Sequence, residues 1–138
     1  MKLARTIRFD PSDLNIFPTA ADEGEWAVVG TFCFSAMPPA NLTGKVKQAF
    51  SNGFLGCQSF GFSTLVSVVQ ARPGDIRAIT DQLANHFVDK FGAPSKVAAK
   101  DAISDEIEFM AELCKSHKTG TLLAIQRSWG DEGIKEVF

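Results

Sequence analysis

The chain has 138 residues and a formal net charge of −2, and 45% of its residues are hydrophobic and 22% charged. This size and composition suit one folded domain over residues 1–138 and exclude disordered or fibrous chains. Because the 14 basic residues are scattered and no apolar run approaches the roughly 20 residues that span a bilayer, we expect a cytoplasmic protein with neither nucleic acid nor a membrane as partner.

Two strands are predicted before residue 36. Residues 3–9 alternate between apolar and polar side chains, which is typical of a half-buried strand, and the turn-forming residues 10–13 should end it. Residues 25–35 are largely apolar on both faces of an extended chain, which predicts a central strand. Within this strand, Gly30 would mark a bulge or leave room for an aromatic ring from elsewhere.

The next segment predicts a short helix followed by a long strand. Asn41 or Thr43 can cap the helix, and Gly53 should end it in a left-handed conformation. The strand is expected over residues 59–71. One of its faces carries Phe and Val side chains, whereas the other also carries three serines, Ser59, Ser63 and Ser67.

Two long helices and a C-terminal pair of elements complete the prediction. Apolar residues recur at helical spacing over residues 75–91, with Asp75 as the cap, and again over residues 101–116. Residues 119–127 predict a strand, and a turn then leads to a last strand or short helix over residues 134–138. This order favours an α+β fold, a mostly antiparallel four- to five-stranded sheet with two long helices packed on one face and one short helix.

Cys114 and His117 are the candidate metal ligands. They have a Cys-x-x-His spacing at the end of a predicted helix, and Cys33 or Cys57 would have to join them across the fold. Cys114 also lies on the apolar stripe of that helix, where a cysteine usually packs as a small hydrophobic residue. We expect no cofactor, and the three widely spaced cysteines predict free thiols rather than disulfides.

A ligand pocket or a thiol active site is a further alternative. The chain has twelve Phe and no Tyr, an apolar aromatic content that fills a core or lines a cavity. Cys57 lies in a glycine-rich link and could act as an exposed nucleophile, with His86 or His117 as the base. The residues expected to line such a pocket are Phe60, Phe62, Ser63, Ser67, Cys57 and His86.

Three acidic clusters are candidates for a magnesium site or an acid–base pair. They lie at residues 22–25, 104–106 and 131–132. Carboxylates in loops and at helix starts are usually solvated, because a charge is costly to bury. We therefore favour solvated charges, and no pair of carboxylates is singled out by its spacing.

Two stretches carry a resemblance to a known family. They are KLARTIRFDPSDLNIFPTAADEGEWAVVGTF near the start, and DEIEFMAELCKSH followed by TLLAIQRSWGDEGIKEVF at the end. They resemble a small family of uncharacterised bacterial proteins, a domain of unknown function, over essentially the full chain. The resemblance implies genes near those of molybdenum-dependent formate dehydrogenases, and hence a cytoplasmic accessory role. It brings no catalytic motif with it.

These observations favour a non-catalytic binding or assembly factor, with a redox enzyme or its maturation factors as the partners implied by the resemblance. One alternative is a small enzyme or ligand carrier with a Phe-lined cavity that uses Cys57 or His86. Another is a metal-binding protein that uses Cys114 and His117. A partly apolar sheet face also predicts a homodimer, the commonest form of self-association.

Overall fold

The computed structural model describes residues 1–138 and has an α+β fold. Six strands form one curled antiparallel sheet, in the order β4-β3-β2-β1-β5-β6. Two further strands pair as a hairpin. The strands are β1 (Lys2–Ile7), β2 (Trp26–Val28), β3 (Phe54–Gly56), β4 (Phe62–Ser63), β5 (Leu65–Gln70), β6 (Leu122–Ala124), β7 (Gln126–Gly130) and β8 (Gly133–Val137).

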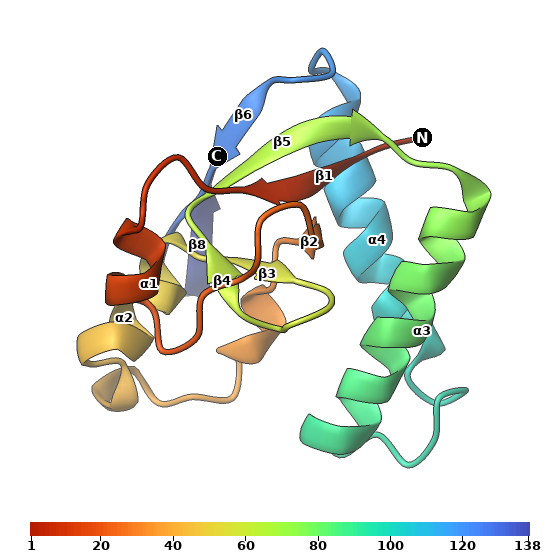
Figure 1. The fold of residues 1–138 in the computed structure, drawn as a ribbon. Coiled ribbons are helices and arrows are strands. Elements are labelled where there is room, and N and C mark those ends of the chain that lie inside the picture. The colour runs from red at the N-terminus through yellow and green to blue at the C-terminus, as the bar shows by residue number, and fades with distance from the viewer.

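The chain has four α-helices. They flank the sheet in two pairs (Figure 1). The long helices α3 (Pro73–Lys90) and α4 (Lys100–Lys115) pack against each other, and α4 also contacts β1 and β2. The short helices α1 (Ser12–Ile16) and α2 (Gly44–Asn52) contact each other on the other side of the molecule. Two single 3₁₀ turns, η1 (Thr31–Cys33) and η2 (Pro39–Asn41), lie between β2 and α2.

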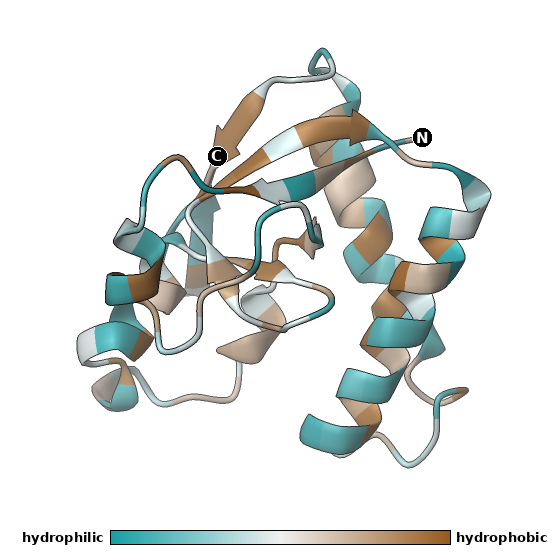
Figure 2. Ribbon diagram, in the orientation of Figure 1, coloured by the Kyte–Doolittle hydropathy of each residue, from teal (hydrophilic) through white to brown (hydrophobic).

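The main hydrophobic core contains 22 buried residues from the sheet and the two long helices. Ile103, Ile107, Met110 and Cys114 form the buried stripe of α4, at the spacing that the sequence predicts. Figure 2 shows mostly hydrophobic residues along β5 and β6, and both kinds of residue in alternation along the long helices. The two predicted long helices are therefore confirmed, together with the α+β class.

A second, smaller core lies under the β7–β8 hairpin. Its five buried residues come from the segment after α1, from the 3₁₀ region and from α2. Phe34 and Phe50 meet edge to face at 5.5 Å, and Trp129 stacks on Phe50 at 6.2 Å. The expectation of four to five strands, one short helix and one core is thus too simple, because the C-terminal hairpin and α1 add a second packing centre.

The predicted strand over residues 25–35 is wrong after Val28. Gly30 has φ +83°, a left-handed conformation, and the chain then forms η1. A Cβ at Gly30 would lie 2.6 Å from the Leu55 Cβ, so this glycine makes room for an aliphatic neighbour on β3 and not for an aromatic ring. The apolar residues beyond Gly30 lie in a turn and not in a strand, and of these Phe34 is buried while Phe32 and Cys33 are half-buried.

The predicted strand over residues 59–71 is also interrupted. Only β4 and β5 form, and the three serines do not share a face, because Ser59 is exposed, Ser63 is buried and Ser67 is half-buried. Gly53 follows α2 as expected, but it has φ −100° and continues directly into β3 instead of turning left-handed.

Helix boundaries follow local signals only in part. Thr43 occupies the position before α2 as expected. The prediction of Asp75 as the cap is wrong, because Arg72 is the N-cap of α3 and Asp75 is its third residue, which accepts a hydrogen bond from the Arg72 backbone N–H at 2.9 Å. The expected turn at residues 10–13 extends into α1, a helix that the sequence pattern does not predict. None of the helices combines the length and the apolar character that a membrane span requires.

Candidate functional site

Three of the predicted pocket residues are placed apart by the fold. Cys57 is fully buried, and burial raises the pKa of its thiol far above the ordinary value. Ser63 is also buried, and its hydroxyl lies 2.8 Å from the carbonyl oxygen of Leu65. Ser67 lies beside Arg5 in the β1–β5 ladder. These side chains serve packing and backbone hydrogen bonding.

Phe60 and His86 do meet, but as a stacked pair. Their rings are parallel with centroids 3.8 Å apart, and burial lowers the pKa of His86. Phe60 has φ +56°, an unusual conformation for a residue with a side chain. Phe62 lies elsewhere, between Phe17 and Phe34. The six residues therefore do not surround one cavity.

The candidate metal pair also lacks further ligands. Cys114 is buried in the core stripe of α4, where burial raises its pKa to about 11. The backbone carbonyl of His117 accepts a hydrogen bond from Lys2 Nζ at 2.7 Å. No group of three or more His, Cys, Asp or Glu side chains is placed to hold a metal ion.

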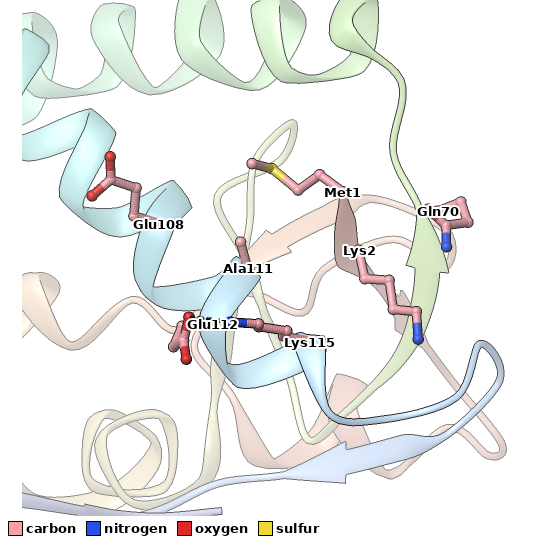
Figure 3. Close-up of a pocket in the computed structure, with 7 residues that line it drawn as sticks. All are labelled: Met1, Lys2, Gln70, Glu108, Ala111, Glu112 and Lys115. Carbon is pink, nitrogen blue, oxygen red and sulfur yellow. Dashed lines mark ion pairs between the residues drawn. The ribbon is translucent and has the colours of Figure 1, made fainter.

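The widest depression is a groove between α4 and the first residues of the chain, with a volume of about 600 Å³ (Figure 3). It is lined by Met1, Lys2, Gln70, Glu108, Ala111, Glu112 and Lys115. Lys115 leans toward Glu112, with 3.9 Å between the charged atoms, whereas Glu108 and Lys2 point away from each other. Exposed, divergent polar groups of this kind do not make a preorganised site.

A smaller cavity on the opposite flank of α4 brings titratable groups together. Its volume is about 180 Å³, and its lining comes from α4, β8, the residue after β2 and the first residue of η1. The lining residues are Val29, Thr31, Asp105, Glu106, Phe109 and Glu136. Three carboxylates thus face one recess that also has two apolar walls.

Glu106 is the most perturbed carboxyl in this recess. Burial raises its pKa from 4.5 to about 7, and the neighbouring charge of Glu136 adds to the rise. Arg127 opposes this effect but does not cancel it. At neutral pH, Glu106 is therefore divided between the protonated and the ionised form, which is typical of functional sites and uncommon elsewhere.

Arg127 connects the recess with the interior. Glu136 accepts a hydrogen bond from the Thr31 hydroxyl at 2.5 Å, and Thr31 Oγ1 accepts one from Arg127 Nε at 2.7 Å. Arg127 is 2% exposed, and its terminal nitrogens donate to backbone carbonyls that include those of Phe50 and Gly53 at the end of α2. Burial lowers its pKa to about 10. The guanidinium thus caps α2 and faces the recess through Thr31.

An apolar dish adjoins the recess at Phe109. It has a volume of about 230 Å³ and is lined by Phe109, Glu112, Leu113 and Phe138. The rings of Phe109 and Phe138 lie 6.1 Å apart and are 46% and 42% exposed. We call the recess and the dish together the α4–β8 surface, which comprises Asp105, Glu106, Phe109, Leu113, Glu136 and Phe138.

The whole chain, residues 1–138, matches the model of a family described as a family of unknown function, DUF6505. The chain belongs to this family. No curated protein and no solved structure matches it. Membership in DUF6505 confirms the expected domain of unknown function. The family description names no activity, so function has to be inferred from the arrangement of the side chains.

Of the charged residues of this DUF6505 site, only Asp105 and Glu106 belong to an acidic cluster that the sequence offers as a candidate acid–base pair. Residues 104–106 and 22–25 are expected to be solvated, whereas Glu106 is partly buried and Glu25 is 1% exposed. No role is predicted for Arg127 or Glu136. The sequence does contain a signal for these residues. A charged side chain stands where the helix or strand pattern places an apolar one at Glu106, Arg127 and Glu136.

The α4–β8 surface can exchange a proton and offers a binding surface. Glu106 and Glu136 form a carboxyl pair of which one member readily holds a proton at neutral pH. The nearest thiol, Cys33, has its pKa raised to about 12 by burial, so it is not a nucleophile. The surface offers negative charge and exposed aromatic rings side by side.

Proposed function

We propose that this protein is a non-catalytic binding protein that docks a partner protein on the α4–β8 surface. The single observation that supports this most is the exposed pair Phe109 and Phe138 beside the carboxylates of Asp105, Glu106 and Glu136. Exposed apolar patches with a polar rim are characteristic of protein interaction sites.

The proposal is favoured over an enzyme by the state of the candidate nucleophiles. Cys57 and Cys114 are buried, and burial raises the pKa of each thiol. His86 is occupied by stacking on Phe60. A thiol enzyme needs a nucleophile and a base within hydrogen-bond reach in a cleft, and these residues do not meet that requirement.

Charge argues against a second copy of this chain as the occupant. In a two-fold dimer through the α4–β8 surface, the carboxylates of one protomer would face those of the other, and like charges oppose such contacts. A homodimer remains a prediction for another face. The resemblance noted in the sequence suggests a redox enzyme or one of its maturation factors as the first partner to test.

Site-specific photo-crosslinking tests the proposal. Phe109 is replaced by p-benzoylphenylalanine in cells that naturally express the protein, and the same replacement of Leu14 on α1, which is 55% exposed, is the matched control. We expect one discrete product from position 109, identified by mass spectrometry, and none from position 14. The purified partner should bind the original chain and should bind the Phe109→Ser variant at least about tenfold more weakly, as for a central aromatic contact.

Two results would overturn the proposal. One is equal labelling, or no product, at positions 109 and 14. The other is a product with twice the mass of the chain, which would make the surface a contact between copies. Thermal melting of Phe109→Ser guards against a folding artefact, since this side chain is nearly half exposed and its loss should leave the melting temperature close to the original.

A further inference from the structure

The acidic recess and the apolar dish are consecutive along α4. Asp105 and Phe109 are four residues apart on this helix, so they are neighbours about 6 Å apart along its axis. Phe109 lines both cavities and so forms their shared wall. Two side chains of a partner that are separated by about one helical turn would therefore fill both cavities at once.

The charge of α4 selects the side chain that enters the recess. The helix carries Asp101, Asp105, Glu106, Glu108 and Glu112, against only Lys100 and Lys115 at its two ends. Neither Glu106 nor Asp105 has an ion-pair partner, because the two ion pairs of the protein are Arg72–Asp75 and Lys115–Glu112. A cationic side chain with an apolar stem matches this recess, since Phe109 and Val29 would contact the stem and the carboxylates the charge.

The neighbouring strand favours an extended partner. β8 is hydrogen-bonded to β7 alone, so its second edge has no strand partner in the chain. Open edges of this kind accept extended segments. In an extended segment, residues i and i+2 lie on the same face and are about 6.6 Å apart, close to the spacing of about 6 Å between Asp105 and Phe109 along α4.

Glu136 at the recess precedes Phe138 at the dish by two residues. We propose that the α4–β8 surface binds an extended segment of a partner protein that runs parallel to β8, in which an Arg or Lys is followed two residues later by a large apolar residue. The cation occupies the recess between Asp105, Glu106 and Glu136, and the apolar side chain occupies the dish between Phe109, Leu113 and Phe138. This inference rests on the proposed function, of which it specifies the partner chemistry.

Fluorescence polarisation with a defined probe tests it. The probe is the capped, fluorescein-labelled peptide GSTRTLTSG, and the control peptides replace its Arg by Glu or its Leu by Ser. We expect the probe to bind at pH 8 and each control peptide to bind at least about tenfold more weakly. The double variant Asp105→Asn/Glu106→Gln should weaken probe binding by about tenfold, whereas Asp81→Asn on the exposed face of α3 should leave it unchanged.

A pH series adds a second test, because purely hydrophobic docking would give a probe affinity that does not change with pH. Probe binding should tighten between pH 6 and pH 8 as Glu106 loses its proton, and the double variant should lose this dependence. Absence of probe binding up to millimolar concentration, equal binding of the Glu peptide, or no effect of the double variant would each overturn the inference.

Failure of the proposed function and failure of this inference are distinguishable. If crosslinking at position 109 identifies a partner but its binding ignores Asp105→Asn/Glu106→Gln and pH, the docking surface stands and the cationic segment is wrong. If crosslinking at position 109 fails, the proposed function is wrong, whatever the peptides do.

Discussion

Two buried charged side chains, Glu25 and Arg127, flank the short strand β2 and have different surroundings. The Glu25 carboxylate accepts hydrogen bonds from the backbone N–H groups of Asp22, Gln58 and Ser59 and from the Ser59 hydroxyl, at 2.6 to 2.8 Å. At the other end of β2, Arg127 donates to the Val29 carbonyl and to Thr31. The Glu25 carboxylate is enclosed by a loop. The Arg127 guanidinium, in contrast, also lies near titratable carboxyl groups.

The difference separates a structural charge from one that is coupled to a site. Every hydrogen bond to the Glu25 carboxylate comes from a backbone N–H or a hydroxyl, groups that keep their protons across the ordinary pH range. Arg127 lies close enough to Glu106 to oppose the rise of its pKa, and Thr31 joins Arg127 to Glu136. Burial of a charged side chain is therefore not by itself a sign of function. Coupling of that charge to titratable groups at a surface cavity is such a sign.

Removal of Arg127 should have the largest effect and should disturb both the fold and the site. Arg127→Met leaves the carbonyls of Phe50, Gly53 and Val29 without their donor, and we expect the free energy of unfolding to fall by about 3–5 kcal/mol in chemical denaturation. Arg127→Lys should recover only part of the loss, because one ammonium cannot reach all these acceptors. Full stability of Arg127→Lys would contradict the role of Arg127 as a cap of α2.

Glu25→Gln should destabilise less and only locally. The amide places N–H groups against donors, so we expect a loss of about 2–4 kcal/mol and faster hydrogen exchange at Gln58 and Ser59. Glu23→Gln, at an exposed neighbour, is the matched control and should change stability by less than about 0.5 kcal/mol. The loop around Glu25 should be independent of the recess. A change in the pKa of Glu106 in the Glu25→Gln variant would therefore contradict the distinction between Glu25 and Arg127.

The sequence predicts the two long helices and the first strand because their apolar residues recur at regular spacing. It predicts one strand over residues 119–127, where β6 ends and β7 begins, and it does not predict β3. Pattern alone fails between residues 28 and 35, where Gly30 adopts a positive φ and Phe34 packs into the second core. An apolar run says that residues are buried; it does not say whether a strand or a turn buries them. The same limit explains why the pattern predicts one strand over residues 59–71 where two form.

The candidate site is predictable only in part. Arg127 follows Leu123 and Ile125 at strand spacing, and Glu136 lies between Ile134 and Phe138, so each charge stands on an apolar face. That Arg127 and Glu136 lie near Glu106 depends on where the chain places the hairpin relative to α4, which no local pattern contains. Thr31, which joins Arg127 to Glu136, carries no sequence signal of its own.

Glu106→Gln should have the smallest effect on stability and the clearest pH dependence. The pKa of Glu106 is raised in the folded state, so the unfolding free energy of the original chain should fall as pH rises from about 4.5 through about 7. Glu136 and Asp105 raise this pKa further, and Arg127 opposes them. The variant should be more stable at pH 8, by an amount on the order of 2 kcal/mol, and unchanged at pH 4.

Denaturation of both proteins at pH 4, 6 and 8 checks this prediction, and Glu108→Gln on the exposed face of the same helix is the control. A stability difference that is constant with pH would show that Glu106 is an ordinary solvated carboxylate, and the distinction drawn between Arg127 and Glu25 would then lose its basis.

Chemical-shift mapping tests the central claim, that the α4–β8 surface binds a segment with one cationic and one apolar side chain, most directly. Amide spectra of the ¹⁵N-labelled chain are recorded with increasing amounts of GSTRTLTSG. We predict that the largest shifts fall on residues 105–113 of α4 and 134–138 around β8, with little change in α3. Largest shifts at Met1, Lys2 and Gln70 in the opposite groove, or at the Phe60–His86 stack, would contradict the claim.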